Sequence, residues 1–276
     1  MTFKKIFLTA GIIAAGAISA SASEIIVDNA PGTANGTPGA FSYIGKGSSK
    51  DHMGGSRYDI YSMEISRVNG IMTVRINTRF VDYNTQNGLN FGDLFMSTEG
   101  VDGRPVWDPT GDPADGYKDD DSYTTGTQWD YVYDLNGARN LTGNNIDNTS
   151  AQLHELNDYD LSESDDRNNF KYGSSRGNKT QLYRVKDEDD AYANSFATGS
   201  VETSTSDNYL QFVFDVSGTQ LASAEQIAFR WTMSCANDII EGVVNFGAKV
   251  PEPAALGLLF LGLAGVGFAR RRARTT

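Results

Sequence analysis

Cysteine and histidine are nearly absent from this chain of 276 residues, which contains one cysteine and two histidines. A single cysteine, Cys235, excludes a disulfide within the chain, and we expect it to pack as a small apolar side chain. His52 and His154 are too few for zinc sites built from several imidazoles. Neither histidine has a sequence context that indicates a catalytic triad. These absences disfavour disulfide-stabilised folds, zinc enzymes and triad hydrolases.

Basic residues are also scarce, with 23 Lys and Arg against 35 Asp and Glu. Six of the basic residues and one acidic residue lie at the two ends of the chain, in positions 1–22 and 250–276. Between them, residues 23–249 hold 17 basic and 34 acidic residues, a net charge of −17. Such a surface repels nucleic acid phosphates and anionic lipids, so no nucleic acid partner is expected. It suits hydrated polysaccharide, divalent cations or plain solubility.

The first 22 residues have the order of a secretory signal peptide. Lys4 and Lys5 precede an apolar run over residues 6–18, and the small residues Ala20 and Ala22 follow. Cleavage after Ala22 leaves Ser23 as the mature start. The alternative is an uncleaved anchor, but the run is shorter than the ~20 residues that a membrane span needs. We therefore predict export through the Sec machinery and processing by signal peptidase.

Residues 23–249 are of a size common for one all-β domain. The clearest pattern is YDIYSMEISRVNGIMTVRINTRF, in which Tyr61, Met63 and Ile65 alternate with polar residues. The alternation resumes after Asn69-Gly70, a pair that favours the two positive-φ positions of a type I′ turn. A β-hairpin centred on Asn69 and Gly70 is predicted.

Similar alternation recurs later in the chain. One apolar face is predicted for Leu210, Phe212, Phe214 and Val216, and another for Ile227, Phe229, Trp231 and Met233, with Ala228, Arg230 and Thr232 on a wet face. The segments GDLFMS, QWDYVY, QLYRV and GVVNFG are four further expected strands. The best candidate for a helix within residues 23–249 is 150–156, with Ser150 as N-cap. We predict an antiparallel β-sandwich of jelly-roll type with long polar loops, a barrel being the alternative.

Two loop regions carry candidate ligand-binding residues. Asp108, Asp112 and Asp115 belong to a carboxylate-dense loop that could supply oxygens to calcium, although the spacing is not that of an EF-hand. Adjacent acids are more often a solvated face. Trp107 and Tyr117 beside these acids could recognise a sugar ring, whereas the nearby Trp129, Tyr131 and Tyr133 are expected to cover the core.

Acidic residues also raise the question of an enzyme. Glycosidases use two carboxyl groups about 5 to 10 Å apart, one with a raised pKa. Among 34 acids such pairs arise by chance, and no sequence pattern places one in an apolar pocket. The segment CANDIIEG is expected to be a final turn and strand; the alternative places Asn237, Asp238 and Glu241 at a ligand or ion. We therefore expect that the protein is not an enzyme.

Positions 250–276 form a separate segment at the C-terminus. Pro251, Glu252 and Pro253 precede 16 uncharged residues, 254–269, and then Arg270, Arg271 and Arg272. As a helix the apolar run reaches roughly 24 Å, against about 30 Å of hydrocarbon. The arginines should stay cytoplasmic and leave residues 23–249 outside. This marginal span suits transient retention in the inner membrane.

The order of Pro-Glu-Pro, apolar run and arginine cluster resembles the PEP-CTERM sorting signal of Gram-negative bacteria. The resemblance implies recognition by an exosortase, an integral-membrane protease, and delivery to the cell surface or the extracellular space, often with exopolysaccharide and biofilm production. It makes Pro251, Glu252 and Pro253 residues of a substrate. The resemblance covers this C-terminal segment alone. Ala254 stands where many members have Ser or Thr.

Two classes of function follow for residues 23–249. The first is a non-enzymatic surface or extracellular-matrix protein that binds polysaccharide, calcium or other matrix components. The second is a secreted carbohydrate-active enzyme that uses paired carboxylates. The first explains the acidic body and the sorting signal without a catalytic pair.

Overall fold

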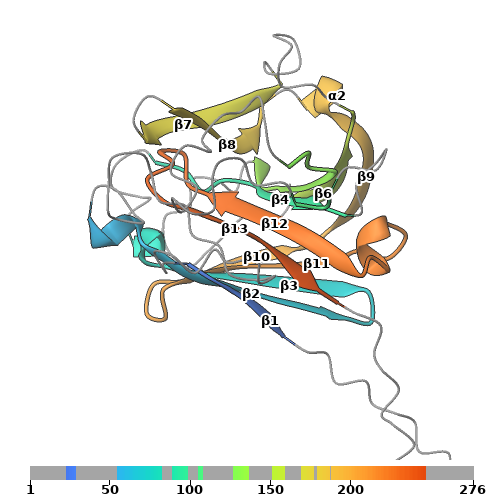
Figure 1. The fold of residues 1–276 in the computed structure, drawn as a ribbon, viewed down its shortest axis with the longest axis horizontal. Coiled ribbons are helices and arrows are strands. Elements are labelled where there is room, and N and C mark those ends of the chain that lie inside the picture. The colour runs from blue at the N-terminus through green and yellow to red at the C-terminus, as the bar shows by residue number, and fades with distance from the viewer. Residues whose placement is uncertain are drawn as a thin grey trace, which may run out of the picture.

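The computed structural model describes residues 23–28, 55–82, 89–98, 105–107, 127–136, 151–158, 169–176, 179–186 and 188–246. They form three layers (Figure 1): a five-stranded sheet, a six-stranded sheet packed against it, and a two-stranded hairpin on the far side of the six-stranded sheet. Every strand pair is antiparallel. The predicted β-sandwich is therefore confirmed.

The five-stranded sheet has the order β1-β2-β3-β11-β10. Its strands are β1 (Glu24–Val27), β2 (Ile60–Val68), β3 (Ile71–Thr78), β11 (Tyr209–Asp215) and β10 (Ser200–Ser204). Short 3₁₀ turns flank β2 and β3, namely η1 (Ser56–Tyr58) and η2 (Arg79–Asp82).

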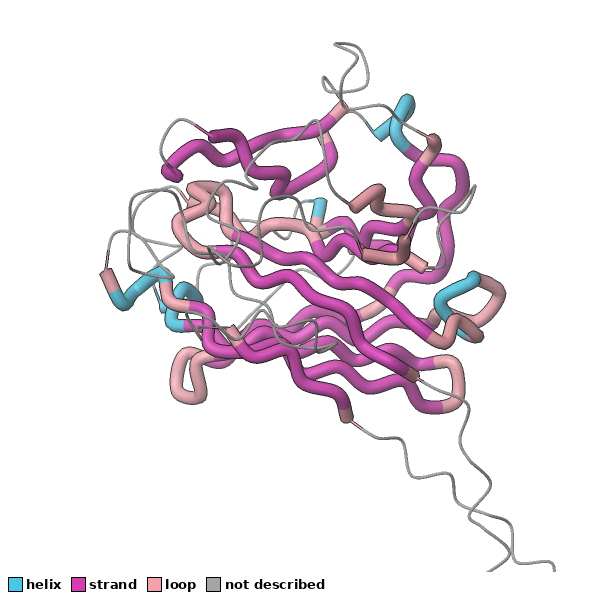
Figure 2. The backbone as a smooth tube through the Cα atoms, viewed as in Figure 1, coloured by secondary structure: helices cyan, strands magenta, loops and turns pink. Residues whose placement is uncertain are grey.

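The six-stranded sheet has the order β13-β12-β4-β5-β6-β9. Its strands are β13 (Ile239–Asn245), β12 (Gln226–Thr232), β4 (Leu94–Ser97), β5 (Tyr131–Asp134), β6 (Gln152–Leu156) and β9 (Tyr192–Thr198). The hairpin consists of β7 (Phe170–Arg176) and β8 (Lys179–Val185). One helical turn, α2 (Glu188–Ala191), and the 3₁₀ turn η7 (Gln220–Ala222) lie at the ends of strands (Figure 2).

The predicted hairpin around Asn69 and Gly70 is the β2–β3 pair. Both turn residues have positive φ, 51° and 82°, and Val68 pairs with Ile71 on either side of them. Positive φ at two successive positions is what the Asn-Gly sequence accommodates. One detail differs from the prediction: a register shift at the start of β2 takes Tyr61 out of the buried face, which contains Ile60 instead.

The main core lies between the two large sheets. It contains the predicted apolar faces of β11 and β12, and Tyr131 and Tyr133 are buried in it as expected. Trp129 is also buried, but in a second apolar cluster on the outer face of the six-stranded sheet. Tyr133 stacks on Phe214 with ring centroids 4.6 Å apart, which adds stabilisation beyond the buried area. Cys235 packs against this core, also as expected.

The prediction of a wet face for β12 is wrong. Ala228, Arg230 and Thr232 are buried, because the β7–β8 hairpin and its neighbours cover the outer face of the six-stranded sheet with a second apolar cluster. Phe95, Trp129, Phe170 and Leu182 belong to this outer cluster. A polar residue in a strand that is covered on both faces needs a partner, and Arg230 has one, as described below.

The predicted helix at residues 150–156 is also wrong. The segment forms β6, which pairs with β5 on one side and β9 on the other. A helix of two turns is marginal by itself, whereas a strand between two neighbours satisfies its backbone groups on both sides. Leu153 packs in the main core and Leu156 in the outer cluster, so both faces of this strand carry apolar residues and no one-sided alternation reveals it.

The two edges of the sandwich are closed in different ways. On one side β9 leads into β10 through a single residue, Gly199, where a Cβ would lie 2.3 Å from the Val213 carbonyl oxygen. On the other side the first and last strands meet, and a Cβ on Gly242 would lie 3.0 Å from the Ile26 side chain. Glycine at both positions lets the backbones approach closely.

Candidate functional site

Of the candidate calcium-binding and sugar-binding residues, the described part of the chain includes Trp107 alone. Asp108, Asp112, Asp115 and Tyr117 lie outside it, as do the signal-cleavage residues Ala20 and Ala22 and the sorting residues Pro251, Glu252, Pro253, Arg270, Arg271 and Arg272. Within the described ranges, no group of three or more His, Cys, Asp or Glu side chains is arranged to hold a metal ion. The calcium and cleavage predictions therefore stay predictions.

Trp107 is half-buried against the outer cluster, and its indole Nε1 donates a hydrogen bond to Glu241 Oε1 at 2.9 Å. Glu241 forms an ion pair with Arg230 on the neighbouring strand. The same guanidinium donates to Gln181 Oε1 at 2.5 Å and to the Leu182 carbonyl at 3.3 Å. These bonds join the β7–β8 hairpin and the Trp107 segment to the centre of the six-stranded sheet. In this position Trp107 and Glu241 contribute to structure.

Asp238 has a similar structural role. It is fully buried, and its carboxylate accepts hydrogen bonds from the backbone amides of Ile60 at 2.7 Å and Ile239 at 2.9 Å. Asp93 bridges layers in the same way, accepting from the amides of Leu135 and Val185. The two carboxylates thus tie loops to strands across the layers, and CANDIIEG is a turn followed by β13, as expected.

His154 lies on the outer face of the six-stranded sheet. Its ring stacks on Tyr192 with centroids 3.8 Å apart, and its Nδ1 is 2.9 Å from Ser195 Oγ across the β6–β9 pair. Burial lowers the pKa of His154, while the charge of Asp134 acts to raise it. Asp134 accepts a hydrogen bond from Tyr192 at 2.6 Å. The neutral imidazole is therefore held by stacking and by a cross-strand hydrogen bond.

Asp130 is a carboxyl group with a perturbed pKa. Burial raises the pKa, hydrogen bonds from Thr98 and Ser97 lower it, and the charge of Asp158 raises it further. The Thr98 amide donates to Asp130 Oδ2 at 2.8 Å. The net effect is a pKa above the usual value for an aspartate, the direction expected of a general acid.

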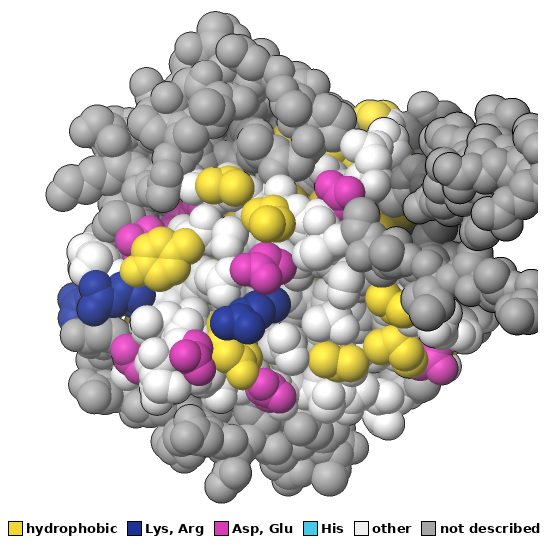
Figure 3. Space-filling model, turned by 90° about the horizontal axis from the view of Figure 1, so that it is seen from below, with side chains coloured by type: hydrophobic (Ala, Val, Ile, Leu, Met, Phe, Trp, Pro, Cys, Tyr) yellow, Lys and Arg dark blue, Asp and Glu magenta, His cyan; other side chains and the backbone are white. Residues whose placement is uncertain are grey.

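The outer face of the five-stranded sheet carries an extended array of polar side chains. The strand register places three side chains of each of four strands on this face: Ser62, Glu64 and Ser66 of β2; Thr73, Arg75 and Asn77 of β3; Tyr209, Gln211 and Val213 of β11; and Ser200, Glu202 and Ser204 of β10. Figure 3 shows this face, with an acidic and a basic side chain next to one another near its centre and hydrophobic ones around them. We call it the open face.

A continuous set of contacts crosses the open face. Asn77 Nδ2 donates to Glu64 Oε1 at 2.7 Å and to Ser62 Oγ at 2.8 Å, and Asn77 Oδ1 accepts from Arg75 Nε at 3.1 Å. The Arg75 guanidinium lies over the Tyr209 ring, 3.9 Å from its centroid. These contacts order the side chains of β2, β3 and β11 before any ligand arrives, which lowers the entropic cost of binding.

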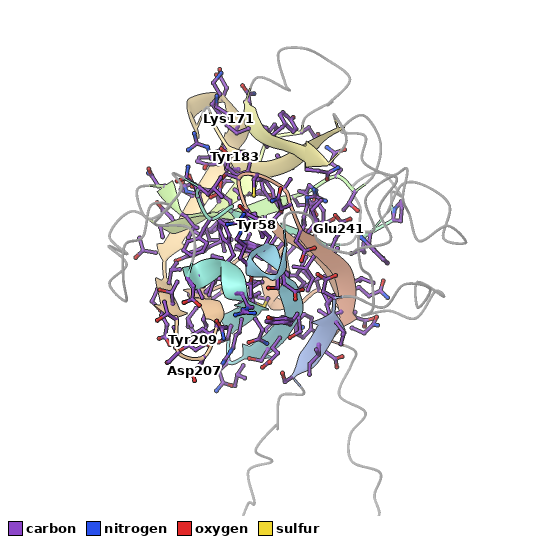
Figure 4. The ribbon with its side chains drawn as sticks, turned by 90° about the vertical axis from the view of Figure 1, so that its left-hand side faces the viewer. Tyr58, Lys171, Tyr183, Asp207, Tyr209 and Glu241 are labelled. Atoms are coloured by element: carbon purple, nitrogen blue, oxygen red, sulfur yellow. The ribbon has the colours of Figure 1, made fainter. Side chains whose placement is uncertain are left out.

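Tyr209 connects the array to the last strand. Its hydroxyl donates to Glu202 Oε1 at 2.5 Å. This hydrogen bond, with a smaller effect of burial, raises the pKa of Tyr209, so the phenol stays protonated. Figure 4 shows Tyr209 beside Asp207, at the end of the sheet opposite the β2–β3 turn. No motif in the sequence marks these residues as a site; the polar positions of the predicted hairpin, Glu64, Arg75 and Asn77, are the available signal.

Comparison with known proteins matches the C-terminal segment. Residues 249–273 match the family profile described as the PEP-CTERM protein-sorting motif. The chain carries a PEP-CTERM sorting signal. The PEP-CTERM motif marks an exported protein that an exosortase recognises and sorts by way of the membrane to the cell surface. No curated protein and no solved structure matches the chain. No helix in the described ranges is both long and apolar enough to cross a bilayer.

Proposed function

We propose that the protein is a non-enzymatic component of the cell surface or extracellular matrix that binds polysaccharide through its open face. Signal peptidase removes residues 1–22, the apolar residues 254–269 hold the chain in the inner membrane for a time, and an exosortase then cuts near Pro251, Glu252 and Pro253. The PEP-CTERM motif supports this route.

The ordered array around Tyr209 is the observation that supports polysaccharide binding. Sugar hydroxyls need both donors and acceptors, and Arg75, Gln211 and Glu64 supply them within three neighbouring strands. Tyr209 supplies an aromatic group that buries area at low entropic cost. The acidic body favours a neutral or hydrated polysaccharide over an anionic one.

Binding can be tested with the purified protein on a glycan array, followed by titration calorimetry on the best neutral polysaccharide. Tyr209→Ala should weaken binding by roughly tenfold, because truncating an aromatic side chain that contacts the ligand costs about 1–2 kcal/mol. Gln226→Ala, on an exposed strand end of the other sheet, is the matched control and should bind like the wild type. Equal affinity of Tyr209→Ala and the wild type would show that the open face is not the binding surface.

A second candidate is a secreted carbohydrate-active enzyme, favoured by the raised pKa of Asp130 and its interaction with Asp158. The same polysaccharides should be assayed for newly released reducing ends. Turnover by the wild type that is lost in Asp130→Asn would favour the enzyme and overturn the non-enzymatic proposal.

A further inference from the structure

One end of the sandwich gathers several chain segments that are distant in sequence. It consists of the β2–β3 turn with its flanking residues (67–71), the last residue of β11 with the segment that follows it (215–225), and Phe246. We call it the exit pole. The Val216 amide donates to the Gly70 carbonyl at 2.8 Å, and the Phe246 amide donates to the Glu225 carbonyl at 2.7 Å.

Arg67 holds these segments together. Its Nη1 donates to the carbonyls of Leu221 at 2.5 Å and Ala224 at 2.9 Å, and its guanidinium lies 4.3 Å from the centroid of the Phe246 ring. Burial lowers the pKa of Arg67. The last described residue of the chain is therefore attached to the β2–β3 hairpin.

Both ends of the sandwich domain leave from the exit pole. β1 begins opposite Ile65, near the end of β2, and β13 ends opposite Gln226. Figures 1 and 2 show the start of β1 and the end of β13 at the same end of the sandwich. The predicted signal cleavage, after Ala22, falls directly before this start.

The lengths of the connecting segments limit how far the pole can lie from a bilayer. Seven residues, 247–253, separate Phe246 from the apolar run of the tail. Fully extended they span at most about 25 Å. Before signal cleavage, the five residues 19–23 separate the first apolar run from β1, at most about 18 Å. Two short connections at one pole fix which end of the sandwich faces the membrane.

The surface chemistry of the pole agrees with this orientation. Val68 and Ile71 are a cross-strand pair beside the turn, with 41% and 40% of their surface exposed, and they are two of the four exposed large hydrophobic side chains in the described ranges. The opposite end of the same sheet carries Ser204, Ser206 and Asp207, hydrogen-bonded to one another and exposed. Apolar side chains at a bilayer interface gain burial, and the far end of the sheet offers no such pair among these three residues.

We propose that the exit pole faces the bilayer while the tail is in the membrane, with the β2–β3 turn against the outer lipid surface of the inner membrane. The occupant of this surface is electroneutral lipid, since Asp215 at the same pole disfavours anionic headgroups. This inference rests on the anchoring step of the proposed function. In that orientation the open face stands at an angle to the bilayer.

The orientation can be measured with the full chain reconstituted into phosphatidylcholine vesicles that contain a headgroup-labelled quencher lipid. A fluorescent probe is attached to Val68→Cys, and in a matched variant to Asp207→Cys, both in a Cys235→Ala background. Flotation reports anchoring, and circular dichroism reports folding. We expect both variants to float and the probe at position 68 to be quenched several-fold more than the probe at position 207.

Two results would contradict the inference in different ways. Failure of the folded chain to float would overturn the anchoring step, and with it the orientation. Flotation with equal quenching at the two positions, or stronger quenching at position 207, would overturn the orientation and leave anchoring intact. If Val68→Cys does not fold, the pair Ile71→Cys and Ser206→Cys supplies the same comparison.

Discussion

Replacing Glu241 with Gln tests whether the buried ion pair fastens the β7–β8 hairpin to the six-stranded sheet. Arg230 and Glu241 are 5% and 3% exposed, so the variant leaves a guanidinium charge buried without its counter-charge. Removing one partner of a buried pair costs about 3–5 kcal/mol. Gln keeps an oxygen that can face either the Trp107 indole or the guanidinium, so we expect the lower end, about 3 kcal/mol. This is a large share of the roughly 5–15 kcal/mol typical of a folded domain.

Urea unfolding of the purified protein, followed by far-ultraviolet circular dichroism, measures this loss. Trp107→Phe is the first control and should cost about 1–2 kcal/mol, because it removes one donor to the buried carboxylate. The double variant Arg230→Met with Glu241→Leu is the second and should be more stable than Glu241→Gln, because it removes both charges. A loss under about 1 kcal/mol in Glu241→Gln, with an unchanged slope against urea, would refute the reasoning.

Three further predictions concern the turn, the core and the exit pole. Gly70→Ala should destabilise the protein by about 1–2 kcal/mol in thermal unfolding, since φ is +82° and a Cβ would lie 2.3 Å from the Ser217 hydroxyl oxygen. Gly218→Ala should cost less, because a Cβ there would meet open space. Burial raises the pKa of Tyr133 to about 12, so the stability that its neutral phenol contributes is complete below about pH 10 and lost as the pH rises towards 12. The free energy of unfolding should therefore fall more steeply over this pH window in the wild type than in Tyr133→Phe. An equal pH dependence of the two proteins would contradict this. Arg67→Met should speed amide hydrogen exchange at the end of β13, and unchanged exchange would show that the guanidinium does not hold this strand.

The sequence predicted the elements whose polarity alternates without interruption. β2, β3 and β11 have one face on the core and one on solvent, so period-two alternation and the Asn-Gly turn identified them. The burial of Arg230 could not be predicted, because the hairpin that covers it lies far upstream in the sequence. β6 was mistaken for a helix because Leu153 and Leu156 are buried on opposite faces of the strand, a spacing of three that also fits one face of a helix.

The candidate sites show the same limit. The sorting signal is a contiguous pattern, and the family match confirms it. The open face is assembled from two strands near the start of the domain and two near its end, and only the register brings Glu64, Arg75, Tyr209 and Glu202 together. Each of these residues is ordinary in its own segment.

The one-residue connection at Gly199 makes the two edges of the sandwich mechanically different. At this edge β9 of one sheet and β10 of the other are joined covalently through one residue, which restricts movement of the two sheets relative to each other. The opposite edge is closed by non-covalent contacts, among them the packing of Ile26 against Gly242 and the hydrogen bond from the Ile60 amide to Asp238. Tension applied through either end of the domain therefore reaches β1 or β13 first. We expect the two sheets to separate at the edge formed by these strands, while the connection at Gly199 holds the other edge together.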